Sequence, residues 1–379
     1  MLRSTLLYLS NQQRVFDFVR HNGLAKKFAS RFVAGEQVEE ALDAVRALNA
    51  KGITASLDLL GESVTREQEA RDTGRQYVHL LDRIRERRLD ANVSVKLTAM
   101  GLDVREELCV EIMHDVLGRA RDYGTFVRLD MESSAYTQRT LDLFYQRLHP
   151  AYPENVGIVL QSYLYRTDAD AADAARARCR VRVCKGAYKE PPAVAYPEKR
   201  DVDAAYVRAM QLLMREGNYP GLATHDEAII DEAKRYAAAE GIAPERYEFQ
   251  MLYGVRRDLQ EALVRDGYRV RVYVPFGTSW YPYLMRRLAE RPANLMFMTG
   301  SVVREALGGR RRGAAAVNGA RAAGAPGAEA FGRGGNGAGP SGAGPTGPGP
   351  NGAGGRSNGS VHAGAGAGAD VAGPGADKR

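Results

Sequence analysis

Eight short apolar runs alternate along the chain with longer stretches rich in alanine, leucine, arginine and glutamate. The runs have the length of β-strands and the longer stretches have helical spacing, which is the order of parallel βαβ units. Eight such units in about 250 residues predict an α/β fold of the (βα)8 TIM-barrel type. The predicted strands are Ile53–Gly61, Asn92–Gly101, Phe126–Glu132, Val156–Tyr163, Arg180–Tyr188, Gly221–His225, Tyr247–Gly254 and Arg269–Gly277.

Most of these runs end in a polar or reactive residue. In a (βα)8 barrel the C-terminal ends of all strands meet at one mouth, where the chemistry takes place. A purely structural barrel would not need so many charged groups at that mouth. The residues expected there include Glu62, Lys96, Asp130, Gln161, Lys185, Thr224, His225, Leu252 and Tyr273.

Lys96 lies within an otherwise apolar strand, and a buried lysine is costly unless it is paired. It is half of an ion pair, an anchor for an anion, or an amine that forms a Schiff base. Asp130 occupies a comparable position on the next strand, on the same face as Arg128. A Lys96–Asp130 pair is therefore expected at the mouth.

The fifth and sixth strands end in features suited to a nucleotide. Gly186 and Ala187 allow close approach of a flat ring to the backbone. Thr224 and His225 open a predicted helix, whose free N–H groups suit a pyrophosphate. The chain has no Walker A or GxGxxG sequence, so a nucleotide is not expected to be held as in a Rossmann fold.

The segment after the last strand predicts a helix over Trp280–Glu290. Tyr283, Arg286, Arg287 and Glu290 fall on one face of it. Two arginines beside a tyrosine can bind a carboxylate or a phosphate bidentately. The alternative is a solvated basic helix, which the crowding of aromatic residues in the same segment disfavours.

Composition divides the chain into three parts. Residues 1–52 are expected to form a helical region packed against the side or bottom of the barrel, and residues 53–307 form the barrel itself. Residues 308–379 are rich in glycine, alanine and proline and predict a disordered tail. That tail has eight basic and three acidic residues, so it carries most of the net charge of +7, and the barrel is not expected to bind nucleic acid.

Other sequence signals point to a cytoplasmic protein. No apolar run is long enough to span a membrane, and the first ten residues do not resemble a signal peptide. The three cysteines are an odd number without a disulfide framework. Neither cysteines nor histidines have the spacing of metal ligands, so no metal is expected.

Several long motifs occur in the order and spacing of one enzyme family. From about Lys27 to Leu307 the chain resembles the monofunctional bacterial proline dehydrogenases, whereas the tail has no counterpart. The motifs that carry the resemblance are LDLLGE, SVKLTAMGL, RLDMESS, VLQSYLYRT, VRVCKGAYKEP, LATHD, FQMLYGV and VYVPFGTSWYPYLMRRLAERPAN.

The resemblance implies non-covalent FAD and oxidation of L-proline to Δ1-pyrroline-5-carboxylate, the first step of proline catabolism to glutamate. Hydride would pass from C5 to FAD N5, and the electrons would pass to a quinone or another acceptor, with peripheral contact at the inner face of the plasma membrane. Asp130 and Arg182 would be catalytic. The residues expected to bind FAD are Met131, Gln161, Arg182, Lys185, Gly186, Ala187, Thr224 and His225. Those expected to bind proline are Lys96, Leu252, Tyr273, Tyr283, Arg286 and Arg287.

Two rival interpretations stay open at this point. One is a class I aldolase-type barrel in which Lys96 or Lys185 forms an imine. The other is a non-catalytic barrel that serves as a scaffold or ligand sensor. A yellow protein with flavin absorbance would decide against the aldolase.

Overall fold

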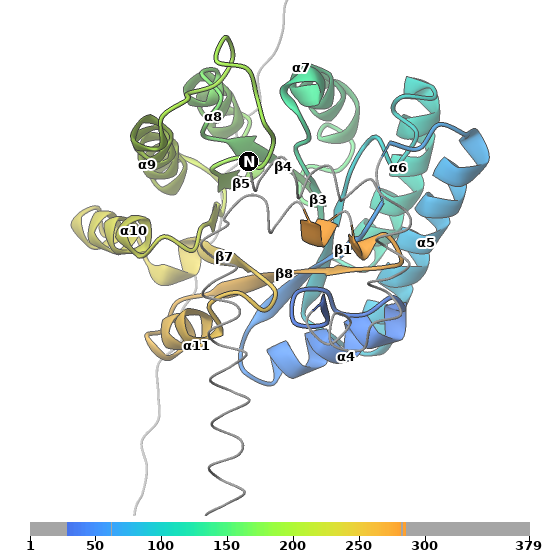
Figure 1. Ribbon diagram of the computed structural model, residues 1–379, viewed down its shortest axis with the longest axis horizontal. Helices are drawn as coiled ribbons and strands as arrows, with labels where there is room; N and C mark the ends of the chain where they lie inside the picture. The colour runs from blue at the N-terminus through green and yellow to red at the C-terminus, as the bar shows by residue number, and fades with distance from the viewer. Residues whose placement is uncertain (1–28, 62, 282, 286–379) are drawn as a thin grey trace, which may run out of the picture. The chain divides into compact units, whose positions relative to one another are not determined.

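Eight parallel strands close into a barrel in the computed structural model, which describes residues 29–61, 63–281 and 283–285 (Figure 1). Each strand pairs with the next one in the sequence, and β8 pairs with β1. The predicted (βα)8 fold is thus confirmed. The strands are β1 (Thr54–Leu59), β2 (Ala91–Val95), β3 (Val127–Leu129), β4 (Val156–Gln161), β5 (Arg180–Cys184), β6 (Gly221–Ala223), β7 (Glu248–Leu252) and β8 (Val270–Phe276).

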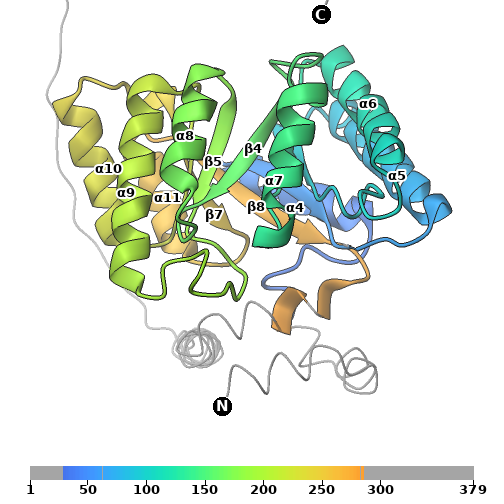
Figure 2. The same ribbon diagram turned by 90° about the horizontal axis from the view of Figure 1, so that it is seen from above.

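The helices between the strands form a ring around the barrel (Figures 1 and 2). Helix α5 (Glu67–Glu86), for example, is amphipathic and buries Ala70, Tyr77, Leu81 and Ile84 at helical spacing. In chain order the described helices are α4 (Val38–Asn49), α5 (Glu67–Glu86), α6 (Glu106–Asp122), α7 (Ser134–Leu143), the π-helix η1 (Phe144–Leu148) that continues α7, α8 (Thr167–Arg176), α9 (Lys199–Glu216), α10 (Glu227–Ala239), the 3-10 helix η2 (Pro244–Arg246) and α11 (Arg257–Arg265).

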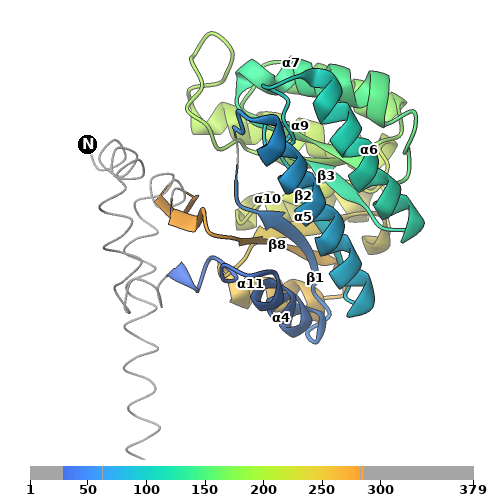
Figure 3. The same ribbon diagram turned by 90° about the vertical axis from the view of Figure 1, so that its right-hand side faces the viewer.

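Helix α4 covers the seam at which the barrel closes. It precedes β1 in the sequence and packs against both β1 and β8, with Ala41, Leu42 and Val45 fully buried. Figure 3 shows it beside α11 at the lower edge of the barrel. The segment that follows β8 is therefore not needed to cover this seam.

The residues before α4 pack elsewhere. Phe32 and Val33 form a small apolar cluster with Leu60, at the end of β1, and with Trp280 and Tyr283, after β8. The indole Nε1 of Trp280 donates a hydrogen bond to Glu36 Oε1 over 3.0 Å. The expectation of packing at the side or bottom is correct for α4 and wrong for residues 29–33, which lie at the C-terminal mouth.

The inside of the barrel is polar, unlike the branched apolar filling usual in this fold. Two glycines make room for the larger inward side chains. A Cβ at Gly221 would lie 2.3 Å from Gln250 Nε2, and one at Gly157 would lie 2.3 Å from the Arg180 carbonyl oxygen and 3.0 Å from Arg128 Nη1. Any larger residue at either place would displace a buried polar group.

Within the part of the chain that the structure describes, no helix has the length and apolar character needed to cross a membrane.

Candidate active site

Five side chains, each from a different strand or from the residue directly after it, meet inside the C-terminal mouth, and we call them the mouth cluster: Asp58, Lys96, Asp130, Arg182 and Tyr273. Asp130, directly after β3, is at the centre. Its Oδ1 accepts a hydrogen bond from Arg182 Nη1 over 2.9 Å, and its Oδ2 accepts one from the Tyr273 hydroxyl over 2.7 Å. The predicted catalytic pair, Asp130 and Arg182, is therefore in direct contact.

Lys96 follows β2 and lies between two carboxylates. Its Nζ is 2.9 Å from Asp58 Oδ1 and 3.9 Å from Asp130 Oδ2. Burial lowers the pKa of Lys96, but the two carboxylates outweigh it, and the net pKa lies above the ordinary value. The expected Lys96–Asp130 pair is present, and Asp58 is the nearer partner that sequence reasoning missed.

Arg182 is almost fully buried and links three neighbours. Besides Asp130, it donates from Nε to Gln250 Oε1 over 2.6 Å and from Nη2 to Ser94 Oγ over 3.2 Å. Its guanidinium also lies over the Tyr273 ring, 5.1 Å from the centroid. Among the described residues these contacts use three of the five guanidinium N–H groups, which leaves two for a ligand.

Burial and the nearby Asp130 carboxylate raise the pKa of Tyr273 well above its ordinary value. The phenol is therefore held neutral, as a hydrogen-bond donor. Leu252, at the end of β7, is half-buried beside it, because β7 and β8 pair through Leu252 and Tyr273. Tyr283 is also buried and belongs to the apolar cluster at the mouth.

A second group of polar residues lies at the ends of β4, β5 and β6. Gln161 donates to the carbonyl of Glu132 over 2.8 Å, close to Met131 in the sequence. Gly186 has a φ of 113°, and a Cβ there would meet the Tyr163 ring at 2.4 Å, so only glycine fits before Ala187. The expected cofactor residues on these strands thus lie on one side of the mouth.

Lys185 and His225 have partners that the sequence did not predict. Lys185 Nζ lies 2.6 Å from Asp203 Oδ1 and 2.8 Å from Asp226 Oδ2. His225 Nε2 accepts a hydrogen bond from the Leu252 N–H over 3.0 Å, so its proton is on Nδ1 when the ring is neutral. At the start of α10, where an anion site is expected, Asp226 is the N-cap residue and the Thr224 hydroxyl accepts a hydrogen bond from the Asp226 N–H.

A second buried polar cluster lies at the other end of the barrel, and we call it the floor cluster: Asn92, Arg128, Glu248 and Arg271. Arg271 donates from Nε to Glu248 Oε1 over 2.7 Å and from Nη1 to Asn92 Oδ1 over 3.0 Å. Gln250 joins the two clusters, since its Nε2 donates to Glu248 Oε1 over 2.6 Å while its Oε1 accepts from Arg182.

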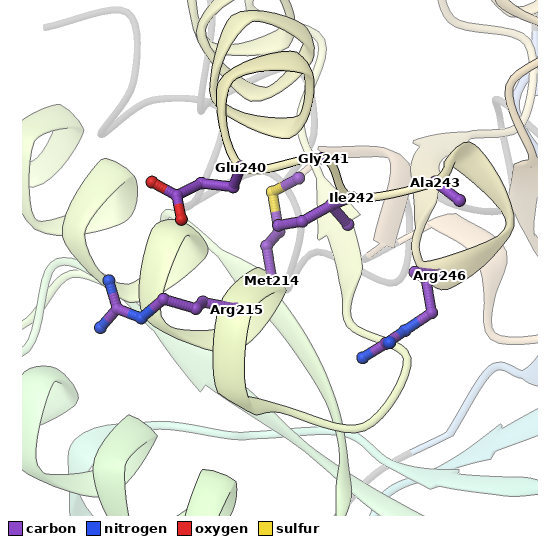
Figure 4. A pocket seen from close by; sticks show the side chains of 7 residues that line it. All are labelled: Met214, Arg215, Glu240, Gly241, Ile242, Ala243 and Arg246. Carbon is purple, nitrogen blue, oxygen red and sulfur yellow. The ribbon is translucent and has the colours of Figure 1, made fainter.

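A surface hollow of about 390 Å³ lies outside the barrel, between the C-terminal ends of α9 and α10 and the short helix η2 (Figure 4). Arg215, Glu240 and Arg246 line it. These helix ends lie near the start of β7, at the opposite end from the mouth cluster. The hollow is therefore separate from the candidate active site.

Some expected site residues lie outside the described residues, namely Glu62, Arg286, Arg287 and Glu290. Sequence reasoning also missed Ser94 and Gln250, which hold Arg182, and Asp58, which holds Lys96. One signal could have found Asp58. It is a lone acid in an apolar strand, which is the same argument that identified Lys96.

Comparisons with known proteins agree on one family. The family model described as proline dehydrogenase matches residues 41–300. Proline dehydrogenase 1 of Bacillus subtilis is 39% identical over 305 residues, which cover 80% of this chain and 100% of the relative. The proline dehydrogenase of Deinococcus radiodurans is 40% identical over 307 residues, which cover 80% of this chain and 98% of the relative.

A solved structure of a related protein also resembles this chain in fold and sequence. The crystal structure of proline utilization A from Bdellovibrio bacteriovorus, inactivated by N-propargylglycine, has a TM-score of 0.66 and 27% sequence identity. The likeness covers 70% of this chain and 32% of that one.

Proposed function

Because the chain belongs to the proline dehydrogenase family, which oxidises proline in proline catabolism, we propose a specific reaction for its mouth cluster. C5 of L-proline loses a hydride and the ring nitrogen loses a proton, so that a C=N bond forms and Δ1-pyrroline-5-carboxylate leaves. The electrons then pass to a quinone-type acceptor. The observation that carries this proposal is the buried array of two carboxylates, two cations and a neutral phenol at the mouth.

Proline is a small ring that carries a carboxylate, and the cluster suits both parts. The Lys96 ammonium supplies one charge-assisted donor to the carboxylate, and Arg286 and Arg287 supply the others. Leu252, Tyr273 and Tyr283 enclose the apolar ring. Fixing the carboxylate at one end determines where C5 lies, so orientation itself contributes to catalysis.

The family implies a flavin, and the polar groups at the ends of β4 to β6 fit FAD. Arg182 retains two N–H donors among the described residues, and Gln161, Gly186 and Ala187 lie at the ends of the same two strands, β4 and β5. Met131, Lys185, Thr224 and His225 complete the proposed FAD site. When bound, FAD accepts the hydride from C5 of proline at its N5.

Asp130 has a positional role in this proposal. It holds the Arg182 guanidinium on one oxygen and the Tyr273 hydroxyl on the other. A fixed guanidinium stabilises negative charge that develops near it, without having to reorganise during the reaction. Asp130 therefore sets the direction of both groups before proline arrives.

The structure bears directly on the aldolase alternative. A Schiff-base lysine needs a lowered pKa so that its amine is free to attack. The two carboxylates beside Lys96 raise its pKa, which keeps the amine protonated. Lys96 is thus a cation rather than a nucleophile.

Anaerobic addition of L-proline to the purified protein tests the proposed function. The protein is expected to be yellow, and proline is expected to bleach its flavin absorbance without any nicotinamide cofactor. A colourless protein that cannot be loaded with FAD would exclude the proposal. Adding a soluble quinone to the bleached protein should restore the colour, and failure to do so would exclude the proposed acceptor.

A further inference from the structure

Asp58 has an unusual position for a charged residue. It lies within β1 with only 1% of its surface exposed, and its Oδ1 is 2.9 Å from Lys96 Nζ. Its Oδ2 is buried and makes no hydrogen bond to any of the described residues. Burying a carboxylate costs free energy, so the presence of Asp58 inside the barrel indicates a role that offsets this cost.

The two carboxylates beside Lys96 differ in what else they hold. Asp130 divides its oxygens between Arg182 and Tyr273, and it is 3.9 Å from Lys96 Nζ. Asp58 has Lys96 as its ion-pair partner at 2.9 Å. Asp58 also lies inside a strand that is paired on both sides, whereas Lys96 lies one residue beyond the end of β2.

We propose that Asp58 is a positioning residue for the substrate, because it anchors the Lys96 ammonium at the place where that group receives the proline carboxylate. This inference rests on the proposed function. Without Asp58, the nearest anion for Lys96 is Asp130, and the lysine would turn towards it and away from the substrate. Asp58 thereby also keeps Asp130 available to Arg182 and Tyr273.

The positioning role and simple charge repulsion predict opposite changes in the affinity for a carboxylate ligand when Asp58 is replaced. If Asp58 were only a negative charge near the site, its removal would make a carboxylate ligand bind more tightly. If Asp58 positions Lys96, its removal makes the same ligand bind more weakly. The substitution Asp58→Asn separates the two, since it keeps the shape and removes the charge.

The ligand for the test is tetrahydrofuran-2-carboxylate, which has the ring and carboxylate of proline and an oxygen in place of the amine. It does not titrate above pH 5, so changes in affinity at higher pH report on the protein. Calorimetry on the flavin-loaded full chain would measure its Kd from about pH 7 to 11, a range that spans the ordinary lysine pKa. We expect about tenfold weaker binding for Asp58→Asn at pH 7.5, the loss of one charge-assisted hydrogen bond.

The pH profile gives a second, independent readout. In the wild type we expect the affinity to change less than about twofold between pH 7 and 9.5, because Lys96 keeps its proton. In Asp58→Asn the affinity should fall further as the pH rises through that range. Asp58→Glu keeps the charge and should recover part of the affinity.

Asp170→Asn is the matched control. Asp170 is also a buried carboxylate with an ion-pair partner, Arg166, but it lies in α8 on the outside of the barrel. Its substitution should leave both the affinity and the pH profile unchanged. Equal effects of the two substitutions, or tighter binding in Asp58→Asn, would overturn the positioning role.

Two further outcomes are distinguishable. If the wild type neither binds the analogue nor is bleached by proline, the proposed function itself is wrong. If circular dichroism shows that Asp58→Asn does not fold, the pH dependence of the wild-type affinity for the analogue is the remaining test of the positioning role. A loss of affinity centred near the ordinary lysine pKa of about 10.4 would then exclude the role of Asp58, and affinity that persists through that pH would support it.

Discussion

The two polar clusters inside the barrel are both largely buried, but their arginines differ in whether they bond to the main chain. In the floor cluster, arginine side chains bond to the main chain: Arg128 Nη1 donates to the carbonyls of Ile158 and Arg180 over 2.9 and 2.8 Å. Arg271 Nη1 likewise donates to the carbonyl of Ala55 over 2.8 Å. In the mouth cluster, the charged side chains bond mainly to each other.

This difference separates a structural role from a functional one. A side chain that satisfies a strand carbonyl cannot release it without leaving a buried acceptor unpaired. Side chains that pair with each other can share their hydrogen bonds with a ligand while the strands stay intact. Burial and charge alone therefore do not identify the site in this barrel, and the identity of the partner atoms does.

The largest effect is expected from Arg182→Met. It removes a cation of the mouth cluster, and we expect kcat/KM for proline to fall about 100- to 1000-fold, as for the loss of a preorganised donor.

Arg128→Met is the matched substitution in the floor cluster. It should cost about 2–4 kcal/mol in the free energy of unfolding, since two buried carbonyls lose a donor, with little change in kcat/KM of the folded enzyme. Urea unfolding and steady-state kinetics would measure both, and similar kinetic losses would remove the distinction between the clusters.

Glu248→Gln tests the floor cluster by pH. The Arg271 guanidinium, acting against burial, lowers the pKa of Glu248 below its ordinary value of about 4.5. Its contribution to stability is therefore present above about pH 4.5 and is lost as the pH falls through the folded-state pKa. We expect the substitution to cost about 3 kcal/mol at pH 7, because it removes the carboxylate partner of the Arg271 guanidinium. The difference from wild type should shrink below pH 4.5, and a difference that is constant with pH would contradict the assignment.

Arg286→Met and Arg287→Met test the proposed carboxylate-binding role of two residues outside the described part of the chain. Each should raise KM for proline by about ten- to a hundredfold, with FAD content near normal, because each removes a charge-assisted bond to the carboxylate. Lysine at either position should restore part of the loss. Prolinol lacks the carboxylate and serves as the control substrate. Equal losses for proline and prolinol would show that the arginines are structural.

Gly221→Ala tests the link between the clusters. The added methyl group would meet Gln250 Nε2 at 2.3 Å, and displacing that amide breaks its bonds to both Arg182 and Glu248. We expect a loss of about 1–2 kcal/mol in unfolding free energy together with a several-fold fall in kcat/KM. Gly118→Ala, in α6, controls for the substitution itself, because the nearest atom to its added methyl group would be the Tyr152 hydroxyl oxygen at 4.0 Å. A change in stability without any change in activity would show that the two clusters are independent.

The smallest effect is expected from deletion of residues 309–379. Their composition predicts no packed structure, so kcat/KM for proline with a soluble acceptor should change less than about twofold. A loss confined to assays with membranes or anionic lipid vesicles would assign the basic tail to lipid contact.

The eight strands could be predicted because short apolar runs and helical stretches alternate without exception. The convergence of Lys96, Asp130 and Arg182 followed from that topology, since the ends of parallel strands meet at one mouth. The partners of side chains at the strand ends could not be read from local sequence. Asp226, the N-cap residue of α10, pairs with Lys185 at the end of the neighbouring strand β5.

Distances across the barrel could not be predicted. The choice of Lys96 between Asp58 and Asp130 depends on the register of β1 against β2 and on ångström-scale differences in reach. Residues 29–33 were placed incorrectly for a similar reason. Their apolar spacing shows that they pack on something, but not that the partners are Leu60 and Trp280, the latter almost 250 residues further along the chain.

The covering of the barrel seam by α4 has a consequence for synthesis on the ribosome. Among the described elements, α4 and β1 are made first, and the partner of β1 on that side is made 216 residues later, as the bond between Thr54 and the Val270 carbonyl shows. At about 5–20 residues per second this interval lasts roughly 10–40 s. Throughout it, one edge of β1 is an unpaired strand able to pair with another nascent chain. Because α4 is already present and packs on both β1 and β8, it shields the apolar face of β1 during that interval and presents a ready-made surface on which the last strand docks.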